Sequence, residues 1–130
     1  MLNEYPLFHG AKGDSITSII QDGFMRPDPH HQIYFSERFD DALQHGADVK
    51  RGASFAFKAM VAIPAGASMS RTSRPGNPVA VVVTTTQPLP TRIIELYVRL
   101  GRAPRFELET IKGIEQIKKY LTRTKAAGSA

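Results

Sequence analysis

Cysteine is absent from this 130-residue sequence, and its absence excludes several kinds of chemistry. Without thiols the chain cannot form disulfides, build cysteine-ligated zinc sites or use a thiolate nucleophile. The glycine-rich phosphate-binding fingerprints of P-loop and Rossmann proteins are missing as well. A nucleotide site in this protein would therefore have to be built from other residues.

Long hydrophobic runs are also missing. No stretch approaches the roughly 18 apolar residues of a membrane-spanning helix, and the first residues lack the pattern of a secretion signal. We therefore expect no membrane partner, and either a cytoplasmic protein or a domain cut from a longer chain. Residues 1–130 are expected to form one domain that buries roughly two thirds of its unfolded surface.

Acidic residues are fewer than basic ones: 12 Asp and Glu stand against 17 Lys and Arg, for a net charge of +5. The imbalance is greatest over residues 92–125, where nine basic residues accompany four acidic ones. Such a segment attracts nucleic acid or another phosphate-bearing partner, but it serves equally well as an ordinary solvated surface.

The hydrophobic pattern predicts an α+β fold. Strands are predicted at residues 7–10, 33–36, 54–63, 79–84 and, as the last strand, 92–100. One helix is predicted between an N-cap at Asp14 or Ser15 and a stop at Gly23, and a second at residues 37–46. A C-terminal amphipathic helix carries Ile111, Ile114, Ile117 and Leu121 on its apolar face. Residues 24–32 and 65–78 are predicted to be loops.

Two short stretches share a plan that suits a small polar ligand. Leu-Phe-His-Gly at residues 7–10 and Ile-Tyr-Phe-Ser at residues 33–36 both run from apolar strand residues to a ring and a small residue. An imidazole can donate or accept a hydrogen bond, and glycine leaves its backbone accessible. We predict that both strands face one cleft. No metal site is predicted, because the adjacent His30 and His31 would rarely converge on one ion.

The order of these residues resembles the ADP-ribosyltransferase superfamily. His9-Gly10, a short helix ending at Gly23 and then Tyr34-Phe35-Ser36 are similar to the His-Tyr-Glu branch, which includes diphtheria-like toxins and the poly-ADP-ribose polymerases. The likeness covers residues 5–46 well and residues 79–100 loosely. It implies a split β-sandwich with flanking helices, with NAD as co-substrate and no metal.

The resemblance also implies individual roles. His9 would hydrogen-bond the adenosine ribose of NAD, the backbone at Gly10 would hold the nicotinamide carboxamide, and Tyr34 would stack on the cationic nicotinamide ring. The family often places a second ring on the following helix, and that position falls near His45. The implied NAD-binding set is His9, Gly10, Ala11, Tyr34, Ser36 and His45.

The family's catalytic glutamate has no unambiguous counterpart. It stabilises positive charge as the nicotinamide–ribose bond breaks, as an anion does beside an oxocarbenium-like transition state. Glu95 is the best candidate from the sequence, which makes His9, Tyr34 and Glu95 the predicted catalytic residues. Many toxin relatives carry the acid one strand earlier, but residues 78–83 contain none. Either Glu95 serves, or another residue substitutes for it, or the acid has been lost.

The predicted function is therefore NAD-dependent transfer of ADP-ribose to a macromolecule, with RNA favoured over protein because of the positive charge. A compact domain of this kind resembles a bacterial effector toxin, secreted or injected to act in a target-cell cytoplasm and neutralised by a cognate immunity protein. Two alternatives stay open. One is an NAD-dependent RNA 2′-phosphotransferase, and the other is a catalytically silent module on the same fold that binds nucleic acid or protein.

Overall fold

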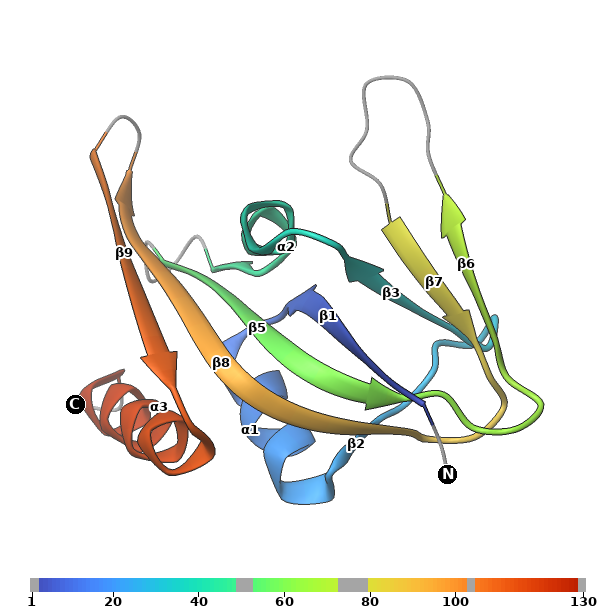
Figure 1. The fold of residues 1–130 in the computed structure, drawn as a ribbon. Coiled ribbons are helices and arrows are strands. Elements are labelled where there is room, and N and C mark those ends of the chain that lie inside the picture. Colours follow the sequence, from blue (N-terminus) through green and yellow to red (C-terminus); the bar gives the residue numbers. More distant parts are fainter. Residues whose placement is uncertain (1–2, 49–52, 73–79, 103–104, 129–130) are drawn as a thin grey trace.

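The computed structural model describes residues 3–48, 53–72, 80–102 and 105–128, and over these residues the protein is of the predicted α+β class (Figure 1). The helices are α1 (Gly13–Asp22), α2 (Phe39–His45) and α3 (Ile114–Gly128). The strands are β1 (Glu4–Gly10), β2 (Phe24–Met25), β3 (Gln32–Ser36), β4 (Ala47–Asp48), β5 (Ala53–Ala62), β6 (Ser68–Thr72), β7 (Ala80–Thr84), β8 (Leu89–Arg102) and β9 (Arg105–Lys112).

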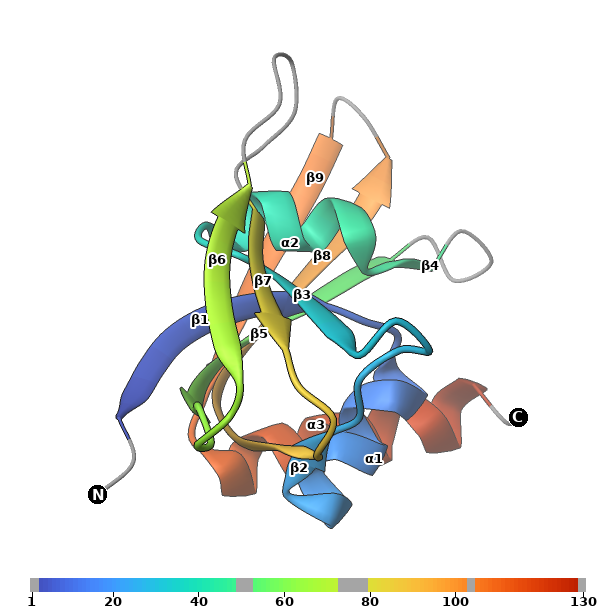
Figure 2. The same ribbon diagram turned by 90° about the vertical axis from the view of Figure 1, so that its right-hand side faces the viewer.

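The strands form one antiparallel sheet in the order β2-β8-β5-β1-β3-β7-β6, with β4 added to β5 and β9 added to β8. β1 pairs with β5 along its whole length, and β3 does the same with β7. β1 and β3, in contrast, are paired only where Phe8 lies opposite Ser36. Figure 2 shows these two strands crossing rather than running alongside each other. The sheet is therefore divided into two parts that meet at this crossing.

The main core lies on one face of this divided sheet. The strand predicted at residues 54–63 is confirmed as β5, and Phe55, Phe57, Ala59 and Val61, which alternate along one of its faces, are all buried. They belong to one cluster with residues from β3 and β7, together with Ile16 of α1 and Ile117 and Leu121 of α3. A smaller cluster on α2, β5 and β8 contains Ala42, Leu43, Ala56 and Tyr97, with Phe8 packed against it. In Figure 1, α1 and α3 accordingly lie at one end of the molecule and α2 at the other.

The helix predictions hold with small corrections. Gly23 ends α1 as predicted, because its φ of 77° suits glycine and its N–H donates to the carbonyl of Ile19. The predicted N-cap is wrong: Lys12 occupies that position, and its carbonyl accepts the first helical hydrogen bond from Ile16 N–H. Asp14 instead lies in the first turn, where a carboxylate interacts favourably with the exposed N–H groups of the helix.

Four strands were missed or mistaken for loops, among them the two-residue β4, which pairs with β5. Phe24 and Met25 form β2 against β8, and residues 68–72 form β6 against β7, although both segments were predicted to be loops. Residues 73–79 lie outside the described part of the chain. The last strand is β9, and it includes Ile111, which was assigned to the C-terminal helix. Gly113, with a φ of 89°, separates β9 from α3.

None of the described helices is both long enough and apolar enough to cross a membrane.

Candidate functional site

A cavity of about 330 Å³ lies where β1, β3 and β7 meet. Four of the residues lining it were predicted to bind NAD: His9, Gly10, Tyr34 and Ser36. Phe35 and Ala80 line it as well and were not predicted to be part of the site. The volume is at the lower end of the roughly 300–1,000 Å³ typical of small-molecule sites. The two motifs therefore do share one hollow, located beside the β1–β3 crossing.

His9 links the two strands at this point. Its Nδ1 lies 2.7 Å from the carbonyl oxygen of Tyr34. Because a carbonyl only accepts, Nδ1 carries the proton, and Nε2 is an acceptor when the ring is neutral. The ring packs against two buried phenylalanines, with centroid distances of 5.6 Å to Phe35 and 5.5 Å to Phe57. His9 is therefore held in a fixed orientation between the core and the cavity.

Gly10 turns its backbone toward the cavity side of β1. In an antiparallel ladder, successive residues direct their backbone groups to opposite sides. Ala11 N–H donates to Phe55 on β5, and at the other end of the strand Ile63 N–H donates to the carbonyl of Asn3. The odd-numbered residues thus bond to β5, and the N–H and C=O of Gly10 point toward β3. Ala11, in contrast, is engaged with β5 and does not line the cavity.

The missing side chain of Gly10 also has a packing role that the sequence did not reveal. A β-carbon at this position would lie 1.9 Å from the carbonyl oxygen of Ala42 and 2.6 Å from the nitrogen of Gly46. Both atoms belong to the backbone at the C-terminal end of α2. Glycine at position 10 is therefore required for α2 to lie against β1.

Tyr34 offers the aromatic surface of the site. The residue is 51% exposed, and its hydroxyl donates to Gln32 Oε1 at 2.7 Å. Both side chains are on the same face of β3, so this bond steadies the ring without burying it. The second aromatic wall was predicted at His45, which is the last residue of α2; its side chain lies outside the described part of the structure.

Glu95 is not brought to the cavity. It lies on β8 opposite Lys58 of β5, Lys58 lies opposite Phe8 of β1, and Phe8 lies opposite Ser36. Three strand spacings separate Glu95 from Ser36, or about 14 Å at 4.8 Å each. Its carboxylate accepts a hydrogen bond from the hydroxyl of Tyr97.

Among the described residues that line the cavity, none carries a carboxylate. Ala80, the first residue of β7, also lines the cavity. Glu37 directly follows Ser36. Arg71 of β6 holds its two oxygens, with Nε 2.5 Å from Oε1 and Nη2 3.0 Å from Oε2. Glu37 is thus the carboxylate that adjoins the cavity wall along the chain.

Tyr97 lies under α2, where Phe39 stacks on its ring at a centroid distance of 5.0 Å. Burial raises the pKa of Tyr97 well above its ordinary value, and the hydrogen bond to the Glu95 carboxylate raises it further. The phenol is therefore strongly held in its neutral form.

This shift predicts an alkaline loss of stability. The stabilisation that a raised pKa gives the folded protein is fully present below the pKa of tyrosine in the unfolded chain, which is about 10. It falls at higher pH because unfolding then releases a proton. We expect the free energy of unfolding in urea to fall less between about pH 8 and about pH 11 for Tyr97→Phe than for the wild type. Tyr5→Phe, at a partly exposed position, is the control. An equal loss in Tyr97→Phe and the wild type would contradict the role of this phenol.

The histidine pair is not part of a metal centre in the described residues, where no group of three potential ligands occurs. Asp28 instead shapes the turn before β3, because its Oδ1 accepts from the N–H groups of His30 at 2.8 Å and Gln32 at 3.0 Å. His31 adopts a φ of 63° in this turn. Asp28 is therefore occupied in positioning the strand that carries Tyr34.

Comparison of the chain with protein-family models, curated proteins and solved structures finds no match.

Proposed function

We propose that this protein is an NAD-dependent ADP-ribosyltransferase and that the nicotinamide end of NAD binds in the cavity at the β1–β3 crossing. The observation that carries the proposal is the meeting of His9, Gly10, Tyr34 and Ser36 around one hollow. The division of the sheet at Phe8 and Ser36 supports the split β-sandwich that the sequence resemblance implies. No metal takes part in the proposed reaction.

Each lining residue suits a different part of this substrate. The exposed ring of Tyr34 provides a face on which a cationic nicotinamide ring can stack. The backbone groups of Gly10 and the hydroxyl of Ser36 match the donors and acceptors of a carboxamide. His9, fixed by its bond to the Tyr34 carbonyl, would contribute its ring to a ribose hydroxyl.

In the proposed reaction the bond between the nicotinamide nitrogen and the ribose carbon breaks, and its electron pair stays with the ring. Neutral nicotinamide leaves, and the acceptor bonds to the ribose carbon and loses a proton. A nearby anion would stabilise the positively charged transition state. We infer that Glu37, rather than Glu95, is placed to supply this anion, because Glu37 adjoins Ser36 and Glu95 is three strands away.

The experiment that tests this function is incubation of the purified protein with NAD labelled in the adenosine part, with bacterial RNA and total protein as acceptors. We expect release of nicotinamide and label on one acceptor, both lost in Glu37→Gln and retained in Glu95→Gln. Loss of both activities in Glu95→Gln alone would show that Glu95 on β8 is the catalytic acid. Transfer of a phosphate from RNA to NAD would identify the phosphotransferase instead.

A binding module without catalysis is the second candidate, and one observation favours it. The described residues lining the cavity include no carboxylate, and Ala80 stands on the strand where many toxin relatives carry one. Absence of both nicotinamide release and label transfer with the wild-type protein would favour this alternative, a silent module that binds nucleic acid or protein. As a toxin, the transferase would act in a target-cell cytoplasm and require an immunity protein, and both expectations depend on the same turnover.

A further inference from the structure

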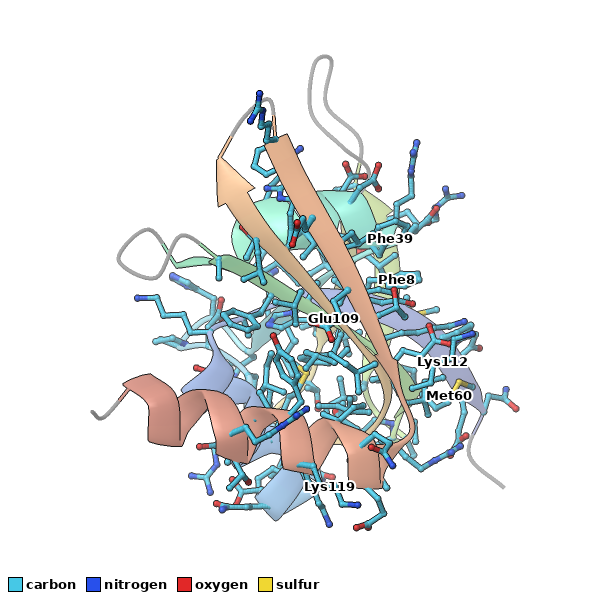
Figure 3. The ribbon with its side chains drawn as sticks, turned by 90° about the vertical axis from the view of Figure 1, so that its left-hand side faces the viewer. Phe8, Phe39, Met60, Glu109, Lys112 and Lys119 are labelled. Atoms are coloured by element: carbon cyan, nitrogen blue, oxygen red, sulfur yellow. The ribbon has the colours of Figure 1, made fainter. Side chains whose placement is uncertain are left out.

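The outer sheet face, which is the side opposite the main core, carries aromatic and basic side chains together. We define it by Phe8, Lys58, Arg92, Arg99, Phe106, Leu108 and Lys112. The registers place Phe8, Lys58, Glu95 and Lys112 in one row across β1, β5, β8 and β9. Phe106 and Leu108 lie on the same face of β9 as Lys112 because they are an even number of residues away. In the view of Figure 3, Phe39, Phe8, Lys112 and Met60 all lie on the right-hand side of β9.

Large apolar groups on this face are open to solvent. Phe106 is 47% exposed and Leu108 is 50% exposed, and Phe39 at the edge of α2 is 36% exposed. Exposed aromatic rings on a strand face provide platforms on which unpaired bases can stack. Two of the rings already have cations beside them: the Arg99 guanidinium lies 4.6 Å from the centre of Phe106, and Lys58 Nζ lies 5.9 Å from that of Phe8.

The charge of the face complements a phosphate backbone. Four of its defining residues are basic, and two glutamates lie among them. Glu4 pairs with Arg92 at 3.1 Å, and Glu95 accepts from Tyr97. Glu107 and Glu109 alternate with Phe106 and Leu108 along β9 and so point to its other side. The outer sheet face therefore has an excess of positive charge beside its rings.

The face is also continuous with the cavity. Phe8 lies directly opposite Ser36, so their side chains are neighbours on the same side of the sheet. Tyr34 is two residues from Ser36 on that side, and both line the cavity. A strand lying along β9 and β8 would thus arrive at the cavity after crossing Lys58 and Phe8.

We propose that the outer sheet face binds single-stranded nucleic acid, with a base stacked on the exposed Phe106, phosphates held by Lys58, Arg99 and Lys112, and the strand passing beside the partly buried Phe8. A single strand fits better than a duplex, since stacking on side chains requires bases that are free of their partners. The inference deepens the proposed function by naming the acceptor class and rests on it for that role alone. Binding to the face needs no NAD.

The test measures fluorescence anisotropy of labelled 12-nucleotide RNA and DNA strands with the full chain, without NAD, over a range of salt concentrations. Phe106→Ala is expected to weaken binding by about 5- to 150-fold, the range observed for loss of one base-stacking ring. Lys112→Ala is expected to lower the slope of log affinity against log salt by about 1. Comparison of the two strands shows whether the 2′-hydroxyl contributes.

Matched controls lie elsewhere on the chain. Phe24 on β2 also has a guanidinium over its ring, that of Arg26 at 5.4 Å, and Lys119 is exposed on α3 (Figure 3). Phe24→Ala and Lys119→Ala should bind like the wild type, and circular dichroism should show every variant folded. Equal affinity for Phe106→Ala and Phe24→Ala would overturn the proposal, as would absence of binding by the wild type.

A last comparison separates an acidic protein partner from nucleic acid. Polyglutamate and unlabelled RNA are compared as competitors at equal concentrations of negative charge. Equal displacement of the labelled RNA by both would also refute the proposal, because base stacking would then add nothing to binding. Hydrolysis of NAD, in which water replaces the macromolecular acceptor and nicotinamide is released, is measured on the same variants and should be unchanged. Strand binding without this NAD turnover would leave the binding face intact while contradicting the proposed transferase.

Discussion

Gly10→Ala is expected to destabilise the protein by about 3 kcal/mol or more, at the upper end of the cost of overpacking a tight contact. The new β-carbon would lie 1.9 Å from the carbonyl oxygen of Ala42, a distance that no side-chain rearrangement relieves because the obstructing atom is backbone. α2 would have to move away from β1, which would expose its own Ala42 and Leu43, both now buried against the sheet. Since domains are stable by only about 5–15 kcal/mol, this loss is a large fraction of the total.

Chemical denaturation of Gly10→Ala measures this cost, and Gly13→Ala is its matched control. The nearest atom to a β-carbon at Gly13 is 3.9 Å away, and the residue lies in the first turn of α1. Alanine there should be neutral or slightly stabilising, because it forms helix more readily than glycine. A Gly10→Ala protein as stable as Gly13→Ala would show that α2 does not require the close approach.

His9→Ala and Tyr34→Ala are each expected to reduce nicotinamide release from NAD by about 30-fold or more. Loss of a stacking interaction with a desolvated cation costs about 2 kcal/mol, which corresponds to about 30-fold. Loss of His9 removes the proposed ribose contact and also the bond from Nδ1 to the Tyr34 carbonyl. The second effect should cost about 1 kcal/mol of folding stability, because one hydrogen bond is lost.

Two conservative variants separate contact with NAD from effects on the strands. Tyr34→Phe keeps the ring and loses only the bond to Gln32, so its turnover should stay close to that of the wild type. His9→Asn keeps an N–H for the Tyr34 carbonyl but lacks the imidazole ring, so it should recover stability without recovering turnover. Wild-type turnover in a folded Tyr34→Ala protein would refute the assignment of the cavity to NAD.

The two predictions concern neighbouring features of one arrangement. Gly10 allows α2 to lie against β1, and α2 in turn packs on Tyr97, beside which Phe8 lies. His9, the residue before Gly10, spans the crossing to β3. A change in either residue thus alters the geometry of the cavity, which is why stability and turnover must be measured on the same variants.

Local pattern was sufficient to predict several elements of this protein. Alternation of apolar residues predicts β5 because successive strand side chains point to opposite faces, and Gly23 predicts the end of α1 because a left-handed turn favours glycine. The two motifs at residues 7–10 and 33–36 pointed to one cleft for a similar reason: each places its polar groups at the end of an apolar strand. Their chemistry depends on residues that are close in sequence.

Features that depend on residues distant in sequence could not be predicted in this way. β6 is exposed at every residue and carries no hydrophobic alternation, and it is a strand only because β7 supplies hydrogen-bond partners. Ile111 continues the helical spacing of α3, yet it belongs to β9, which is paired with β8. Glu95 was predicted to be the catalytic acid from its local sequence, but the order of the strands, set by long-range pairing, places β5 between β8 and the cavity-lining strand β1. Sequence spacing specifies which side chains share a face, and pairing between remote strands specifies which of those faces meet.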